Sequence, residues 1–133
     1  MSKARLVKQV VATTPNETGE FFKITSTLAD AQVNLKGICA WGKESEAHFA
    51  LLTDNNAKAM AALSAKGIKT TEEEAVAVAL EDKVGAAGTI AKKIKEANID
   101  LKYVYGTTCG CKDTSALLVL ASLDNAKIIS CLK

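Results

Sequence analysis

"ADAQVNLK" (residues 29–36) and "KEANIDLK" (residues 95–102) are two versions of one segment, 66 positions apart. In each, the end of an amphipathic helix leads through a polar turn into an apolar strand. The same shift relates Gly19 to Gly85, and a shift of 69 relates Asn56 to Asn125 further along. The chain is therefore an internal duplication, and the duplication decides which fold the sequence predicts.

The first copy alternates strands and helices in a recognisable order. We expect strands at Leu6–Thr13, Val33–Ala40, Ala47–Thr53 and Ile68–Thr71, with helices at Thr18–Ala31 and from Asp54 or Asn55 to about Lys66. The stripe Phe21, Ile24, Leu28 and Ala31 has the spacing of a helix that buries one face. The order β-α-β-β-α-β is that of a ferredoxin-like repeat.

The second copy repeats this order but stops early. It begins with a strand at Val76–Leu80 and a helix at Ala86–Ala97, whose stripe is Ala87, Ile90, Ile94 and Ala97, and it ends with a helix at Asp124–Leu132. No final strand follows, so the fold class is α+β with two repeats, 1–73 and 74–133, the second shortened. Antiparallel sheets should carry their helices on one face. One sheet edge is then left open or covered by a partner chain.

Composition excludes several classes of protein. With 133 residues, 48% of them hydrophobic, and a net charge of +2, the chain has an ordinary globular composition. Its one basic cluster is Lys92, Lys93 and Lys95, and it holds six aromatic residues, so we expect no nucleic-acid partner. It has no apolar run of about 20 residues, so we expect no membrane partner, a cytoplasmic location and reduced cysteines. Strands that are apolar on both faces favour a homodimer.

Two glycine-containing loops resemble nucleotide-binding motifs but lack essential parts. Gly85-x-x-Gly88 lacks the first glycine of a dinucleotide fingerprint. The nearby Asp100 lies at the start of its strand, whereas the fingerprint needs an acidic residue near the end of that strand. The stretch from Gly37 to Lys43 resembles a phosphate-binding loop, but Glu44 stands where a magnesium-binding hydroxyl is required. We therefore expect no nucleotide cofactor.

A smaller set of residues recurs in both copies. Asn16-x-x-Gly19 precedes the first helix, with Asn34 fifteen residues after the glycine; Asp82-x-x-Gly85 and Asp100 have the same spacing. Glycine allows close approach of a ligand, helix N–H groups bind a carboxylate, and amide or carboxylate oxygens accept from an ammonium group. Such a set suits a free amino acid. The same residues also suit helix caps and turns, so both interpretations stay open.

The doubled pattern, with "PNETGEFFKITSTLADAQVNLKGI" and "EDKVGAAGTIAKKIKEANIDLKYV", resembles a tandem ACT-domain protein. ACT domains are small regulatory modules that bind amino acids, and the resemblance implies a serine-type set like that of the phosphoglycerate dehydrogenase regulatory domain. The implied ligand-binding residues are Asn16, Glu17, Thr18, Gly19, Asn34 and Leu35 in the first copy, and Asp82, Lys83, Val84, Gly85, Asp100 and Leu101 in the second. Two features depart from the family: Thr18 and Val84 replace its common proline, and the second copy has acids in place of amides.

The leading hypothesis is a non-enzymatic regulator whose effector is an amino acid and whose target is a separate metabolic enzyme or regulator. Cys109-Gly110-Cys111 supports an alternative, a thiol-based metal or redox sensor, although a closed zinc site would need four ligands. His48 is the only histidine and lies in a strand pattern, so we predict no catalytic residues and no metal site. A small ferredoxin-like enzyme is the least favoured hypothesis.

Overall fold

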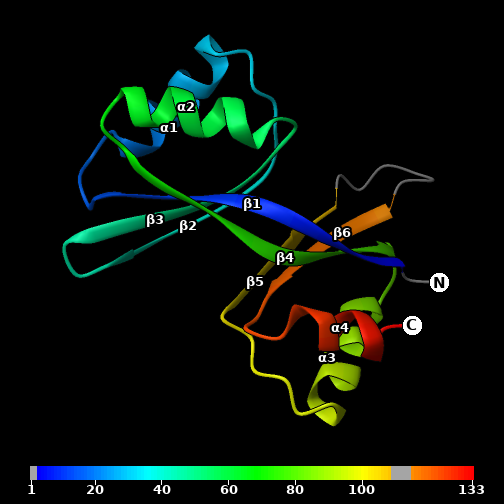
Figure 1. Ribbon diagram of the computed structural model, residues 1–133. Helices are drawn as coiled ribbons and strands as arrows, with labels where there is room; N and C mark the ends of the chain where they lie inside the picture. The colour runs from blue at the N-terminus through cyan, green and yellow to red at the C-terminus, as the bar shows by residue number, and fades with distance from the viewer. Residues whose placement is uncertain (1–2, 109–114) are drawn as a thin grey trace. The chain divides into compact units, whose positions relative to one another are not determined.

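A computed structural model describes residues 3–108 and 115–133 of the chain. Its strands and helices follow the predicted order, except that the last strand of the first copy and the first strand of the second are one continuous strand (Figure 1). They are β1 (Lys3–Pro15), α1 (Glu20–Asp30), β2 (Leu35–Lys43), β3 (Glu46–Thr53), α2 (Asn56–Ala65), β4 (Lys69–Glu81), α3 (Ala86–Glu96), β5 (Tyr103–Thr107), β6 (Ser115–Ala121) and α4 (Asn125–Cys131). The α+β class and the ferredoxin-like repeats are confirmed.

The chain divides into two compact units. The N-terminal unit is Lys8–Glu73, and the C-terminal unit is Glu74–Lys133 together with the start of the chain up to Val7. β1 and β4 each contribute residues to both units. The prediction of two separate strands at 68–71 and 76–80 was wrong, because residues 72–75 contain no glycine or proline and the strand continues through them. The assignment of 1–73 and 74–133 as the two domains stays a prediction.

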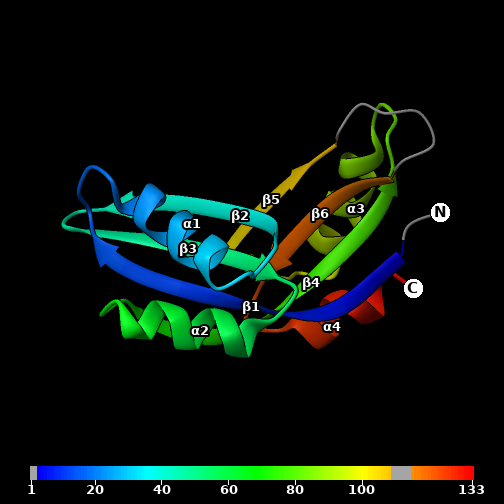
Figure 2. The same cartoon turned by 90° about the horizontal axis from the view of Figure 1, so that it is seen from above.

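In the N-terminal unit the strands lie in the order β2-β3-β1-β4. β3 pairs antiparallel with both of its neighbours, with Val10 opposite Leu51 and Trp41 opposite His48. Figures 1 and 2 show α1 and α2 on the same face of these strands, as predicted. The other face of the β2–β3 hairpin therefore carries different side chains, since neighbouring residues of a strand point to opposite faces.

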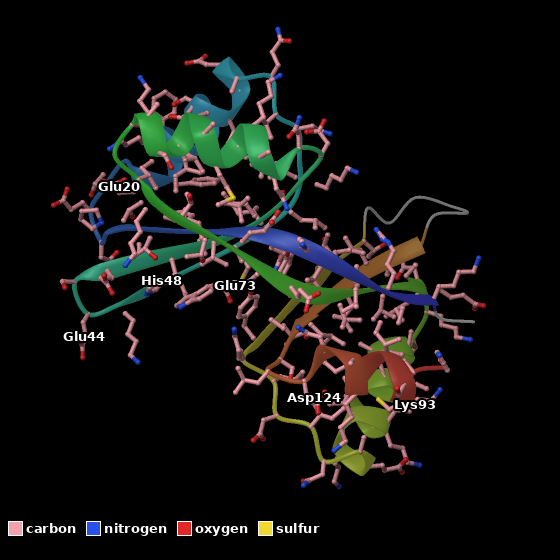
Figure 3. All side chains as sticks on the ribbon, viewed as in Figure 1. Glu20, Glu44, His48, Glu73, Lys93 and Asp124 are labelled. Atoms are coloured by element: carbon pink, nitrogen blue, oxygen red, sulfur yellow. The ribbon has the colours of Figure 1, made fainter. Side chains whose placement is uncertain are left out.

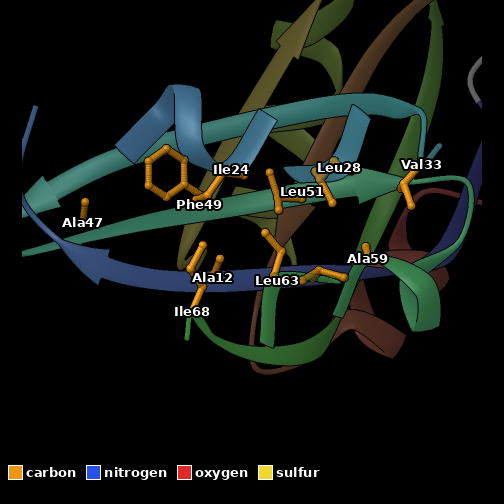
Figure 4. Close-up of a cluster of buried hydrophobic side chains, with 11 residues drawn as sticks. Ala12, Ile24, Leu28, Val33, Ala47, Phe49, Leu51, Ala59, Leu63 and Ile68 are labelled. Carbon is orange, nitrogen blue, oxygen red and sulfur yellow. The ribbon is translucent and has the colours of Figure 1, made fainter. Parts of the chain in front are cut away.

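The core of this unit is formed between the helices and the sheet (Figure 4). Ile24 and Leu28 of α1 and Leu63 of α2 are at most 1% exposed, and each such burial contributes about 1.5–3 kcal/mol. The prediction that Phe21 belongs to this buried stripe was wrong, because its side chain is 60% exposed. Phe21 stands in the first turn of α1, where the sheet-facing stripe has not yet reached the core.

In the C-terminal unit the strand order is β1-β4-β6-β5, with Val76 opposite Leu120 and Tyr105 opposite Val119. The start of β1 takes the place of the missing last strand, and Ala4 packs against the core of this unit. The expectation that this edge is open or covered by a partner chain was therefore wrong. β1 begins at Lys3 instead of Leu6 and is long enough to serve both units.

The duplication is visible in how the second helix of each unit begins. Asn55 and Asp124 cap α2 and α4 by accepting from the backbone N–H groups of Lys58 and Lys127. The next residue of each copy fastens the helix to a strand. The side-chain amide of Asn56 donates to the Lys8 carbonyl at 2.9 Å, and that of Asn125 donates to the Glu74 carbonyl at 3.1 Å.

Candidate functional site

The loop between β1 and α1 is tied to the turn of the β2–β3 hairpin. The backbone N–H of Asn16 donates to the Ser45 carbonyl at 2.8 Å, and its side-chain Nδ2 donates to the Glu44 carbonyl at 3.3 Å. The amide of Asn16 also lies against Gly42, where an added Cβ would come within 2.8 Å of Nδ2. Asn16 therefore positions the loop over the hairpin, which differs from the helix cap considered for it.

Gly19 ends this loop and begins α1. Its φ of 93° lies in the left-handed region, which an L side chain rarely adopts, and Gly85 has the same role before α3 with a φ of 87°. Among the described side chains, none caps the first turn of either helix. The N–H groups of the first turn of α1 are therefore directed at the loop and suit a carboxylate.

A cavity of about 420 Å³ opens between this loop, the first turn of α1 and the helix-side face of the hairpin. Small residues on the hairpin make the hollow: Ala40 and Ala47 leave space that larger side chains would fill, whereas the amide of Asn16 takes the space beside Gly42. Figure 4 shows Ala47 at the opposite end of the labelled cluster from Val33. The described lining residues are Asn16, Glu17, Gly19, Glu20, Phe21, Ile38, Ala40, Trp41, Gly42, Ala47 and Phe49.

Glu20 is the first residue of α1 and belongs to this lining. Its Oε2 is shielded from solvent and has no hydrogen-bond partner among the residues that the structure describes. Figure 3 shows Glu20 on the side of the sheet that carries the helices and His48 toward the other side. A buried carboxylate oxygen without a donor is unfavourable, so this atom is an acceptor available to a ligand.

The structure brings part of the predicted set together. Asn16, Glu17 and Gly19 line the cavity, whereas Thr18 is not among its described lining residues. Asn34 and Leu35 lie beyond the other end of α1, which at 11 residues is about 16 Å long. The backbone N–H of Asn34 donates to Oδ1 of Asp54 at 3.0 Å, and its carbonyl accepts from the Asp54 N–H. Within this unit Asn34 therefore has a turn contact and does not meet the cavity.

In the second copy, the loop before α3 also contacts the neighbouring hairpin. Oδ2 of Asp82 accepts from Oγ1 of Thr108 at 2.9 Å, so Asp82 ties its loop toward the β5–β6 hairpin as Asn16 does in the first copy. Lys83 and Val84 are exposed loop residues, and the Lys83 ammonium lies 3.2 Å from a Glu81 carboxylate oxygen. The Asn16 side chain donates its hydrogen bond, whereas the Asp82 side chain accepts one, because an aspartate carboxylate has no N–H to donate.

Asp100 and Leu101 line a different cavity, of about 250 Å³, at the far end of α3. The Asp100 carbonyl accepts from Oγ of Ser122 at 2.7 Å, a contact between the entry to β5 and the loop before α4. α3 has 11 residues and separates this cavity from the Gly85 loop by about 16 Å. The two parts of the second predicted set therefore lie at opposite ends of the unit.

Sequence reasoning missed most of the cavity lining. Glu20 directly follows the predicted Gly19, and its counterpart in the second copy is Ala86. This difference between equivalent positions was the signal that could have identified Glu20. The small residues Ala40, Gly42 and Ala47 were a weaker sign. Their common face follows from the pairing of Ala40 with Phe49 and of Gly42 with Ala47, which a sequence does not state.

The thiol hypothesis falls largely outside the described residues, because Cys109 and Cys111 lie in the segment 109–114. Cys39 and Cys131 are free, and burial raises the pKa of the Cys39 thiol. Within residues 3–108 and 115–133, no three His, Cys, Asp or Glu side chains come together as a metal site. The metal or redox sensor stays a prediction.

His48 lies on the sheet face away from the cavity. Its Nδ1 is 3.3 Å from Oγ1 of Thr13, and its ring stacks on Trp41 with centroids 5.6 Å apart. This is the sheet-face position that the sequence predicted.

Comparison with known proteins identifies the fold. No protein-family model matches the chain, and no curated protein matches it. A solved protein from Bacteroides thetaiotaomicron is 19% identical over 97% of this chain and 88% of its own, with a TM-score of 0.85. The ligand-free regulatory subunit of aspartate kinase from Thermus thermophilus is 10% identical over 97% and 93%, with a TM-score of 0.66. The corresponding subunit from Thermus flavus is 11% identical over 98% and 94%, with a TM-score of 0.63.

These likenesses define the class of fold. The chain has the tandem ACT-like architecture that the sequence resemblance predicted, and its solved neighbours include regulatory subunits of an enzyme. In the part of the chain that the structure describes, no helix combines the length and apolarity needed to span a membrane.

Proposed function

We propose that this chain is a non-enzymatic regulatory protein that binds a free amino acid in the 420 Å³ cavity of its N-terminal unit. The observation that carries the proposal is the joining of three features at one place: the predicted Asn16–Gly19 loop, the first turn of α1 and the buried oxygen of Glu20, the last two having no side-chain cap or hydrogen-bond partner within residues 3–108 and 115–133. The cavity has the size of a small-molecule site.

The two ends of an amino acid have matching partners in this cavity. The carboxylate suits the N–H groups of the first turn of α1, where the helix dipole favours negative charge. The ammonium group suits a carboxylate, and the cavity offers two of them, those of Glu17 and Glu20. The side chain then packs over Ile38 and Phe49. Asn34, Leu35 and the predicted residues of the second copy remain candidates for binding a ligand elsewhere, outside this cavity.

Regulation would follow from a difference in affinity between two states of the protein. The loop and the hairpin that form the cavity are joined by the two hydrogen bonds of Asn16, so a ligand between them stabilises one arrangement of both. We propose a separate metabolic enzyme or regulator as the target, a cytoplasmic location and a homodimeric assembly. The solved neighbours that are regulatory subunits support the regulatory part of this proposal.

A thermal-shift screen of the twenty amino acids at millimolar concentration tests the proposal. A ligand at ten times its Kd adds about 1.4 kcal/mol of stability, which raises the Tm of a chain of this length by about 5 °C. The variant Ala40→Leu should lose the shift, because Ala40 is exposed toward the cavity and a leucine there fills it.

The matched control is Ala61→Leu, an exposed position on α2 outside the cavity, which should keep the shift. If no amino acid raises the Tm, or if Ala40→Leu responds as fully as Ala61→Leu, amino-acid binding in this cavity is refuted.

A further inference from the structure

The charges around the cavity are strongly one-sided. Of the described residues that line it, the ionisable ones are Glu17 and Glu20, and both are acids. Lys23 and Lys43 are close in sequence but are not among these lining residues. The ionisable side chains that line the cavity are therefore both negative, and the start of α1 adds a partial positive charge.

Glu20 has the more demanding environment of the two acids. One of its carboxylate oxygens is buried and unpartnered among the described residues, and a carboxylate away from water is stabilised only by a donor or an opposite charge. The side chain stands beside an apolar floor that includes Ile38, Ala40 and Phe49. An ammonium group on an alkyl chain matches both parts of this site: it offers three donors to the Glu20 carboxylate, and its methylene groups pack against the apolar lining.

We infer that the cavity prefers a compact organic cation, a molecule with more ammonium groups than carboxylates, and that Glu20 is the residue that selects it. This inference rests on the proposed function for the place of binding and narrows its ligand class. A basic amino acid and a short diamine share the required chemistry. An amino acid with a neutral side chain offers no second ammonium group and leaves one of the two acids unpaired.

Isothermal titration with three probes tests the inference: L-lysine, L-norleucine, which has the same chain without the terminal ammonium, and 1,4-diaminobutane. We expect L-lysine to bind at least about tenfold more tightly than L-norleucine, since a hydrogen-bonded charge pair of this kind is worth that much or more. Higher salt should reduce this difference, because part of the pair is exposed.

The variant Glu20→Gln should bring L-lysine and L-norleucine to within about threefold of each other, because an amide keeps the size of the side chain but not its charge. Asp30→Asn is the matched control: it removes the same charge from the exposed far end of α1 and should leave the discrimination intact. Circular dichroism and Tm of both variants check that the fold is retained.

The outcomes separate this inference from the proposed function. If L-norleucine binds as tightly as L-lysine to the wild-type protein, or if Glu20→Gln keeps the full discrimination, the cation preference is refuted while amino-acid binding stands. If 1,4-diaminobutane binds and none of the twenty amino acids does, the cation preference holds and the proposed amino-acid effector is refuted. If none of the twenty amino acids and no diamine binds, both fail.

Discussion

Gly19 provides a sharp test of the loop geometry. Replacing Gly19 with alanine forces an L side chain into a φ of 93°, which costs about 1–2 kcal/mol. No described atom lies within 4 Å of the added Cβ, so steric clash contributes nothing and backbone strain is the whole native-state cost. Alanine also restricts the unfolded chain, which returns about 0.4–1 kcal/mol. The net expectation is a loss of about 1 kcal/mol, or about 4 °C in Tm.

Gly88 is the matched control for this change. It lies inside α3, its Cβ would also meet no described atom within 4 Å, and its φ is not positive. Alanine is favoured over glycine in a helix by about 0.8–1 kcal/mol, so Gly88→Ala should stabilise the protein. The two glycine-to-alanine changes should therefore differ by about 2 kcal/mol, with opposite signs.

Urea unfolding followed by circular dichroism measures both variants, with the midpoint as the readout and the slope as a check that the denatured state is unchanged. Gly85→Ala should behave like Gly19→Ala, because its φ of 87° places it in the same conformation. A midpoint for Gly19→Ala equal to or above that of the wild type would refute the argument that the left-handed conformation requires glycine here.

Two further predictions follow from the described contacts. Asn56→Ala and Asn125→Ala should each lower the free energy of unfolding by about 1 kcal/mol in urea titrations, because each removes an amide that donates to a strand carbonyl. If both variants are as stable as the wild type, the anchoring role is contradicted. In a variant that keeps Cys39 as its sole cysteine, a thiol reagent should react with Cys39 more slowly than with free cysteine near pH 8. Burial raises the pKa of Cys39, so its thiolate forms at higher pH and the difference between the two rates should shrink as the pH rises. A rate for Cys39 at or above that of free cysteine at pH 8 would contradict this.

The helix faces were predictable to different degrees. Ile24 and Leu28 were placed correctly in the core from their spacing, because a helix that covers a sheet buries one stripe. Phe21 fits the same spacing but is exposed, since the first turn of α1 extends over the cavity instead of the core. Periodicity indicates which side of a helix faces inward but not where along its length the covered region begins.

The candidate site was predicted in part for a similar reason. Asn16 and Gly19 were found because their spacing recurs in the second copy as Asp82 and Gly85, and Glu17 was implied by the family resemblance. Asn34 was grouped with them by spacing and by the family resemblance, and the rigid length of α1 places it about 16 Å away within the same unit. The acidic Glu20 and the small residues of the hairpin meet there through strand register, which depends on residues distant in sequence.

The sequence by itself determined the duplication, the order of strands and helices, and the glycine positions that start α1 and α3. These properties are local, and local propensity and periodicity record them. The tertiary structure alone decided that β4 runs unbroken through both units and that the start of β1 replaces the missing strand of the second copy. It also decided that one carboxylate oxygen of Glu20 is buried without a hydrogen-bond partner among the described residues. These depend on which distant segments pair and in what register, and that is decided by the packing of the whole chain.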